Sequence, residues 1–353
     1  VYYAAHKSAK KLIFWSLILW GVFASLTGII SDVRILIAIR FLLGVVESAV
    51  FPSMLLLLSR WFTKAERSRA NTLMMFGNPI TVLWMSIVSG YLLNSLGWRW
   101  MFIWEGVPAI IWAFFWWKLI DNKPKDAKWL TQEEKDALEE ALQKEQEGIK
   151  PVKNYLVAFK SRTVILLSLQ YALWSIGVYG FVIWLPSMIK AAPNMSIVET
   201  GWLSSVPYLM SIIGMIIVSY FSDKTLKRKI FIWPSLFIGA IAFYSSYLIG
   251  PDHFWISFAL LSIAGMTMYI PYGPFWATIT EILPANVAGV SMALINSLGA
   301  LGAFAGSYLV GYLNGSTGSF GASYAFMAGS LFLSSVLTII AVKDKGKSFA
   351  KSG

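Results

Sequence analysis

Two charged side chains interrupt the apolar stretch RFLLGVVESAVFP, which covers residues 40–52: Arg40 and Glu47 lie seven residues apart. On a helix, seven steps of about 100° bring Glu47 back to within about 20° of Arg40, about 10.5 Å further along the axis. Arginine stays charged and offers a planar fork that suits a carboxylate, whereas a glutamate held away from water can exchange a proton near neutral pH. The spacing predicts a shared cavity in which Arg40 attracts an anion and Glu47 carries a proton. The alternative is that both charges only hold helices together.

The composition places these two charges inside a membrane. Of the 353 residues, 57% are hydrophobic and only 13% are charged, a more apolar composition than that of soluble domains. An arginine at membrane depth costs at least about 2.5 kcal/mol, so a functional role is favoured. Apolar windows long enough to cross about 30 Å of hydrocarbon recur along the chain. We predict an all-α polytopic membrane protein with ten spans, at residues 12–31, 35–59, 70–93, 100–120, 163–188, 200–221, 230–249, 254–281, 286–313 and 320–342.

The basic residues gather on one side of the predicted spans. The formal net charge is +11, and few Lys or Arg fall on the other side, among them Arg34, Arg99 and Lys190. This distribution follows the positive-inside rule, so we expect cytoplasmic termini and a cytoplasmic 121–162 connection rather than a nucleic-acid-binding surface. His6 and His253 lack metal-ligand spacing, and the sequence contains neither a GxGxxG loop nor a P-loop. We therefore expect no enzyme activity, no cofactor and no metal.

The two halves of the chain form a parallel repeat. KSAKKLIF at 7–14 resembles KTLKRKIF at 224–231. Two predicted spans precede the second copy but six residues precede the first, so we expect ten helices of an ancestral twelve; the alternative is a ten-helix fold with chance similarity. The expected domains are a four-span bundle at 1–120, a cytoplasmic connection at 121–162, a six-span bundle at 163–342 and a cytoplasmic tail at 343–353. In the connection, Thr131 and Glu134 have the spacing of a capping box that starts a helix.

Several motifs in the right order resemble those of one family. RFLLGVVES at 40–48 and YFSDKTLKRK at 220–229 resemble signatures of the major facilitator superfamily, whose fold is two six-helix bundles. SRWFTKAERSRA (59–70), GWRWMFIWEGVPAI (97–110), FVIWLPSMI (181–189) and YGPFWATITEIL (272–283) are similar to its anion:cation symporter branch. That branch begins with a helix carrying an acidic residue beside an arginine, and these two residues have no counterpart in the sequence. The resemblance supports the roles given to Arg40 and Glu47.

Further candidates lie at matching depth in other predicted spans. Asn78 and Asn296 offer donors and acceptors that suit hydroxyl groups. In YIPYGPFWAT, prolines disrupt the helix and free backbone carbonyls, which is tolerated where they face a cavity. Tyr272 and Trp276, with Gln170, Tyr171, Trp174 and Tyr179 of the 163–188 span, are expected to give a polyol amphipathic walls. Among these aromatic residues, the resemblance favours Trp276 and Tyr179. A second set of charges, at cytoplasmic helix ends, is expected to interlock and gate: Glu66, Arg69, Asp223, Lys224 and Arg228. Glu105 is interpreted as a packing or gating group.

These features together predict a proton-coupled symporter, a monomer of the bacterial inner membrane, that moves a sugar-acid anion by alternating access of two bundles. A hexuronate, an aldonate or an aldarate would be its substrate, taken with protons. One alternative is a transporter of a small non-sugar carboxylate, such as tartrate or a di- or tricarboxylate, by symport or exchange. Another, of a different class, is a non-transporting or truncated membrane protein.

Overall fold

The computed structural model describes residues 7–48, 50–146, 161–190, 192, 194–225, 227–282 and 285–342. Throughout these residues the regular structure is helical. The chain divides into two compact units. Unit 1 combines Val1–Gly77 with Ser89–Ile149, and unit 2 combines Asn78–Val88 with Lys150–Gly353.

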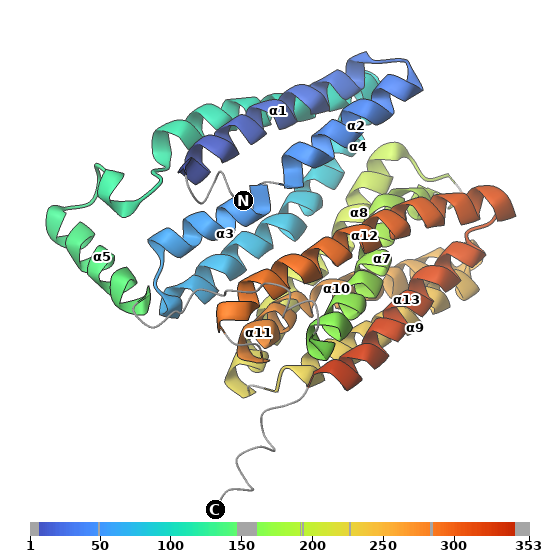
Figure 1. Cartoon of the computed structure of the whole chain (residues 1–353). Helices are drawn as coiled ribbons and strands as arrows, with labels where there is room; N and C mark the ends of the chain where they lie inside the picture. Colours follow the sequence, from blue (N-terminus) through green and yellow to red (C-terminus); the bar gives the residue numbers. More distant parts are fainter. Residues whose placement is uncertain are drawn as a thin grey trace, which may run out of the picture. The chain divides into compact units, whose positions relative to one another are not determined.

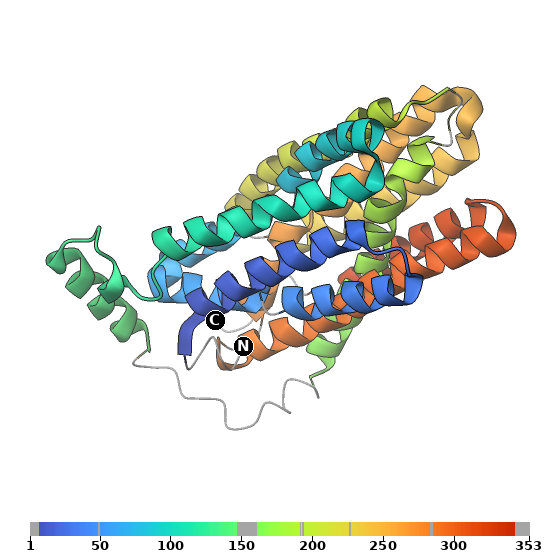
Figure 2. The ribbon, with the colours of Figure 1, turned by 90° about the horizontal axis from the view of Figure 1, so that it is seen from above.

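Unit 1 is built from long helices and a charged appendix. Its elements are α1 (Ala9–Ile29), α2 (Val33–Ser48), α3 (Val50–Trp61), most of α4 (Lys64–Leu119), the 3₁₀ helix η2 (Pro124–Asp126) and α5 (Gln132–Gln146). Figures 1 and 2 both show α5 standing apart from the long helices of this unit. At its start, the Thr131 N–H donates to Glu134 Oε2 at 2.9 Å and the Glu134 N–H donates to Thr131 Oγ1 at 3.3 Å. The predicted capping box is therefore confirmed. The Thr131 N–H and the Thr131 hydroxyl both donate to the Glu134 carboxylate, and these two bonds hold the pKa of Glu134 below its usual range.

The element α4 is two helices joined at Gly97. Its backbone leaves the helical region there, at φ 77° and ψ 169°, a left-handed φ that favours glycine. Two residues sixteen positions apart on one continuous helix would lie about 24 Å apart. The side chains of Ser89 and Glu105 instead form a hydrogen bond. The chain therefore turns back on itself at Gly97, and α4 is a helical hairpin.

Unit 2 contains the remaining helices, and Figure 1 shows α7, α9, α12 and α13 side by side within it. Its elements are α7 (Arg162–Lys190), α8 (Ile197–Thr225), α9 (Lys229–Ile249), the 3₁₀ helix η3 (Pro251–His253), α10 (Phe254–Tyr269), α11 (Tyr272–Ile282), α12 (Ala285–Thr317) and α13 (Gly321–Ala341).

Small residues and buried hydroxyls join the helices of unit 2. A Cβ atom at Gly302 or Gly306 of α12 would overlap main-chain oxygens of α7, so glycine is needed for these two helices to approach so closely. Gln170 Nε2 donates to Ser334 Oγ at 3.0 Å, and that hydroxyl donates to the Gln170 carbonyl at 2.9 Å, which ties α7 to α13. Such bonds satisfy polar groups where no water is at hand.

The prediction of many membrane spans is confirmed. Over the described residues, eight helical stretches are long and apolar enough to cross a membrane. One of them, Leu73–Leu119, contains the break at Gly97 and covers two predicted spans. Helices α2 and α3 together cover the predicted span at 35–59. Every predicted span therefore falls on a helix or on a pair of consecutive helices.

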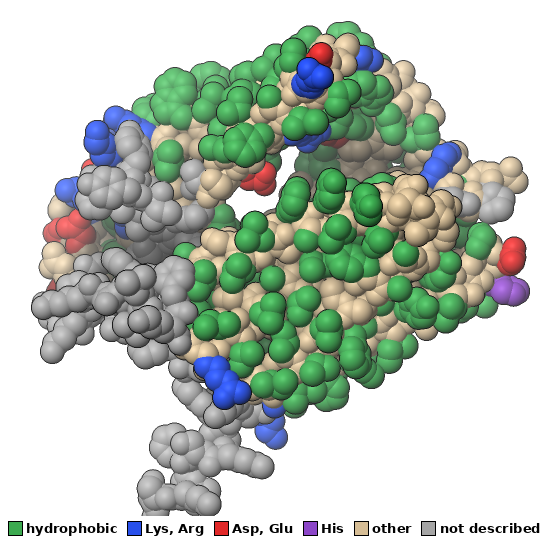
Figure 3. All heavy atoms as spheres, turned by 45° about the vertical axis from the view of Figure 1, so that its right-hand side comes forward, with side chains coloured by type: hydrophobic (Ala, Val, Ile, Leu, Met, Phe, Trp, Pro, Cys, Tyr) green, Lys and Arg blue, Asp and Glu red, His purple; other side chains and the backbone are tan. Residues whose placement is uncertain are grey.

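The sides of the helices are apolar where they face outward. On α8, residues 209, 213, 216, 217 and 220 recur at helical spacing and are all at least half exposed: Leu209, Ile213, Ile216, Ile217 and Tyr220. Figure 3 shows hydrophobic side chains scattered over the visible side of unit 2, with charged side chains near its ends. An outer surface of this kind suits contact with lipid rather than with water.

Candidate functional site

The first candidate site lies in unit 1, around Arg40. The Cζ atom of its guanidinium lies 4.8 Å from the centroid of the Phe102 ring, a distance at which a cation is attracted to the ring face. Phe102 and Glu105 stand three residues apart on α4 and so share a face of that helix. The opposite charges of Arg40 and Glu105 attract each other in this arrangement. Arg40 therefore has both an aromatic ring and a carboxylate in its surroundings.

Glu105 is held across the α4 hairpin. Ser89 lies eight residues before Gly97 and Glu105 lies eight residues after it, so both side chains lie about 12 Å from the turn. The Ser89 hydroxyl donates a hydrogen bond of 2.5 Å to Oε1 of Glu105. A hydrogen bond to an ionised carboxylate is stronger than one between neutral groups. This bond fixes the carboxylate at one depth within unit 1.

Arg40 lies at nearly the same depth as Glu105. Helix α2 begins at Val33, seven residues before Arg40, which puts Arg40 about 10.5 Å from that end. The loop before α2 lies beside the α4 turn, because Arg99 Nη2 donates to Ser31 Oγ at 3.0 Å. Depth measured from either turn is therefore comparable. The cation on α2 and the carboxylate on the α4 hairpin therefore lie at a similar depth in unit 1.

Glu47 lies further than Arg40 from the end of unit 1 that contains Gly97 and the start of α2. It is the penultimate residue of α2 and is exposed, about 10.5 Å beyond Arg40 along the helix axis. The cavity shared by Arg40 and Glu47 stays a prediction. The carboxylate that lies level with Arg40 is that of Glu105, which the sequence patterns had assigned to packing or gating.

The second candidate site is an aromatic cluster in unit 2. Tyr171 stacks on Phe275, with ring centroids 5.2 Å apart and an interplanar angle of 10°. The rings of Trp276 and Tyr272 lie 5.3 and 6.4 Å from Tyr171, and Trp174 lies 4.4 Å from Tyr272. The predicted residues Tyr272 and Trp276 therefore lie together with Tyr171 and Trp174 of α7, which were predicted for the same wall.

A break between α10 and α11 shapes this cluster. α10 ends at Tyr269 and α11 begins at Tyr272, because Pro271 has no N–H to continue the helical pattern. The indole N–H of Trp174, a fully buried side chain, donates to the Met268 carbonyl at 2.9 Å. The predicted break is confirmed. The Met268 carbonyl, however, binds the Trp174 indole instead of being left open to a cavity.

Three further predicted residues belong to unit 2. Tyr179 is 40% exposed, and it lies near Tyr269 and Tyr272. The exposed Asn78 accepts a long hydrogen bond of 3.5 Å from the Tyr269 hydroxyl. Asn296 is half-buried on α12. Tyr179 and Asn78 thus come close to the aromatic cluster, whereas Asn296 has no described contact with it.

The predicted gating charges are described only in part. Arg228 is 8% exposed, and its Nη1 donates to Ser222 Oγ at 2.9 Å, while Lys224 is exposed. The side chains of Glu66, Arg69 and Asp223 lie outside the described residues. Their interlocking therefore stays a prediction.

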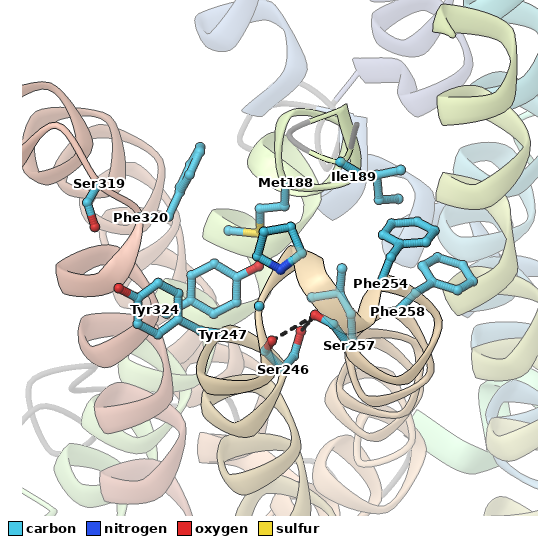
Figure 4. A pocket seen from close by; sticks show the side chains of 14 residues that line it. Met188, Ile189, Ser246, Tyr247, Phe254, Ser257, Phe258, Ser319, Phe320 and Tyr324 are labelled. Carbon is cyan, nitrogen blue, oxygen red and sulfur yellow. Dashed lines mark hydrogen bonds between the residues drawn. The ribbon is translucent and has the colours of Figure 1, made fainter. Parts of the chain in front are cut away.

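Unit 2 also contains a cavity of about 220 Å³ away from the predicted residues. It lies between the ends of α7 and α9, the start of α10 and the link from α12 to α13 (Figure 4). Its wall includes Tyr247, Phe320 and Tyr324, and the hydroxyls of Ser246 and Ser257 lie 3.0 Å apart. All the residues that line it are uncharged, so it offers an anion no ionic partner.

A comparison with known families decides what kind of protein carries these sites. The model of the Major Facilitator Superfamily matches residues 2–307. The chain belongs to this superfamily. It is an integral membrane transporter and not an enzyme. A D-xylose–proton symporter of known crystal structure shares its fold, with a TM-score of 0.74 at 15% identity, over 97% of this chain and 83% of that one.

Curated relatives of this facilitator differ in what their names say they carry. A protein of Agrobacterium vitis named as a tartrate transporter is 30% identical over 338 residues, 94% of this chain and 75% of that protein. A quinolone resistance transporter of Acinetobacter baumannii is 31% identical over 344 residues, 94% of this chain and 78% of that one. A Bacillus subtilis protein named for galactarate and D-glucarate transport is 25% identical over 344 residues, 90% of this chain and 74% of that one.

Sequence patterns missed several residues that the facilitator places at its candidate sites. Phe102 lies beside Arg40 and Tyr269 belongs to the aromatic cluster, and neither was predicted, while Glu105 was predicted in a different role. One signal could have found Glu105: it and Ser89 stand at equal distances from the glycine between two predicted spans. No comparable signal marks Tyr269, since membrane helices carry many tyrosines that only pack or face lipid.

Proposed function

We propose that this facilitator is a proton-coupled symporter of a sugar-acid anion, a hexuronate, an aldonate or an aldarate, that works by alternating access. The observation that carries the proposal is Arg40, a permanent cation within an apolar helix of unit 1, next to an aromatic ring. A guanidinium within an apolar membrane helix needs an anionic partner, and its planar fork matches a substrate carboxylate. The relatives named for tartrate and for galactarate and D-glucarate transport support an anionic substrate.

The remaining residues are assigned by their chemistry. Arg40 binds the substrate carboxylate and Glu47 carries the coupled proton. Sugars pack apolar C–H faces on aromatic rings and pair their hydroxyls with polar groups. The hydroxyl-rich part of the substrate is therefore bound by aromatic and amide side chains: Asn78, Tyr179, Tyr272, Trp276 and Asn296. A separate set forms the cytoplasmic gate: Glu66, Arg69, Asp223, Lys224 and Arg228. The protein works as a monomer in the bacterial inner membrane, with cytoplasmic termini.

A second candidate substrate is a small hydroxy-dicarboxylate. It is favoured by the relative named for tartrate transport, which is 30% identical to this chain. A four-carbon dicarboxylate would use Arg40 in the same way but would leave much of the aromatic wall without a partner. Substrate length therefore separates the two candidates.

Uptake into liposomes tests both. Purified protein is reconstituted, and labelled D-galactonate, D-glucuronate, tartrate and norfloxacin are supplied with and without an inside-alkaline pH gradient. We expect galactonate or glucuronate to accumulate against its gradient only when the pH gradient is present. Accumulation of tartrate alone would favour the second candidate, and transport of norfloxacin alone would overturn both. Empty liposomes and protein with Arg40→Gln serve as controls.

A further inference from the structure

We propose that Glu105 is a second proton-coupled carboxylate of this facilitator: it balances the charge of Arg40 in the empty protein and is protonated when a substrate carboxylate takes its place. The inference deepens the proposed function and rests on it for the identity of the competing anion. Its basis is the juxtaposition in unit 1 of Arg40, Phe102 and Glu105, with Ser89 behind the carboxylate.

The geometry gives Glu105 two different partners. On one side, Ser89 holds it by a 2.5 Å hydrogen bond across the α4 hairpin. On the other side is the guanidinium of Arg40, which lies over Phe102, three residues before Glu105 on the same face of α4. Ser89 keeps the carboxylate level with the cation, so the two charges attract each other without the carboxylate having to leave its hydrogen bond.

No other charge at this depth competes for the role within the described side chains of unit 1. Helix α1 packs against α4 here, because a Cβ at Gly106 would overlap the Gly21 carbonyl, but its charged residues lie in its first turn. The charged and titratable side chains described on these four helices, the pair itself included, are Lys10 and Lys11 on α1, Arg34, Arg40 and Glu47 on α2, Arg60 on α3, and Tyr91, Arg99, Glu105 and Lys118 on α4. Of these, Arg40 is the charge that acts on Glu105.

Competition for Arg40 leads to proton coupling. Before substrate arrives, Arg40 and Glu105 together are neutral. When a substrate carboxylate pairs with the guanidinium, two carboxylates share one cation, and like charges close together disfavour double ionisation. A proton from water then bonds to a carboxylate oxygen of Glu105, and the site is neutral overall again. No electron moves, and the net change is one anion and one proton bound.

One arm of the test needs no substrate. Thermal unfolding midpoints are measured in detergent for wild type, Arg40→Gln, Glu105→Gln and the double variant. Arg40→Gln leaves Glu105 without its cation, so adding Glu105→Gln should raise the midpoint of that variant by about 2–4 °C or more. The pair Arg34→Gln and Glu105→Gln is the matched control, with additive effects expected. Additive effects for Arg40 and Glu105 as well would overturn the inference.

The other arm measures proton uptake when D-galactonate binds in weakly buffered solution with a pH indicator. We expect Glu105→Gln to bind the probe but to take up about one proton fewer per substrate than wild type at the pH of greatest uptake. Equal uptake by the two proteins would refute the inference. If wild type binds no sugar acid, the proposed function fails, and the unfolding arm alone decides whether Glu105 is the counter-charge of Arg40.

Discussion

Replacing Arg40 with lysine keeps a positive charge in α2 but removes the planar fork, so it separates charge from geometry. Lysine carries a compact, strongly hydrated ammonium that cannot pair with both oxygens of a carboxylate at once. If Arg40 binds substrate through two parallel hydrogen bonds, Arg40→Lys should weaken binding even though the charge, and a cation–π contact with Phe102, can remain.

The magnitude follows from the bond that is lost. A hydrogen bond to a charged group contributes about 1.5–3 kcal/mol. At about 1.4 kcal/mol per tenfold change, Arg40→Lys should raise the Kd of a sugar-acid anion roughly 10- to 150-fold. Arg40→Gln also removes the charge, and truncating one partner of such a pair costs about 2–5 kcal/mol. Its Kd should rise at least as much, up to several thousandfold by the same conversion.

Titration of purified protein with D-galactonate, followed by tryptophan fluorescence, measures both Kd values. Arg34→Lys is the matched control, because Arg34 lies in the first turn of the same helix and is exposed; its Kd should stay within about twofold of wild type. If Arg40→Lys binds D-galactonate as tightly as wild type, the two parallel hydrogen bonds from Arg40 are refuted. If Arg40→Gln binds it as tightly as wild type, Arg40 is not the anion site.

Three further predictions concern the scaffold. Trp174→Phe keeps an aromatic ring but leaves a buried carbonyl at the helix break without its donor, so it should lower the free energy of unfolding by about 1–3 kcal/mol; no change in chemical unfolding would contradict this role. Gly302→Ala places a methyl against the α7 main chain and should prevent a stable fold, whereas Gly315→Ala in the same helix meets nothing within 4 Å and should be tolerated, as judged by monodisperse gel filtration. The pKa of Glu134 is lowered by its bonds to Thr131, so the cap should stabilise α5 above the usual glutamate pKa of about 4.3 and be lost as the pH falls through the lowered pKa. Circular dichroism of a peptide of residues 128–146 should show this loss of helix as the pH falls. The peptide with Thr131→Ala, which lacks the cap, should show a smaller loss.

Much of the fold could be predicted from the sequence because lipid imposes simple rules on it. A span needs a long apolar window and a satisfied backbone, so hydropathy alone located helices such as α7 and α13. The capping box at the start of α5 was equally readable, since it depends on two side chains three residues apart. Local chemistry of this kind is visible in one short stretch of sequence.

The candidate sites were harder to predict because they depend on side chains that are far apart in the chain. The spacing on α2 placed Arg40 and Glu47 along one cavity, a prediction that stands, but it gave no sign that Glu105, on the α4 hairpin, lies level with Arg40. Likewise, the helix break at Pro271 was predicted correctly, yet nothing in its neighbourhood indicated that Trp174, from α7, would bind the Met268 carbonyl. Spacing along one helix gives depth and face, but it does not say which side chains of other helices share them.

The central claim, that Glu47 couples a proton to movement of the anion, is tested most directly by Glu47→Gln in liposomes. Two measurements are made on the same preparation: exchange of labelled for unlabelled D-galactonate, and accumulation of label driven by an inside-alkaline pH gradient. We predict that Glu47→Gln retains exchange, because the binding residues are intact, and accumulates much less label than wild type, because glutamine takes up no proton and Glu105 alone would couple one proton fewer per substrate. Accumulation at the wild-type level would contradict the account.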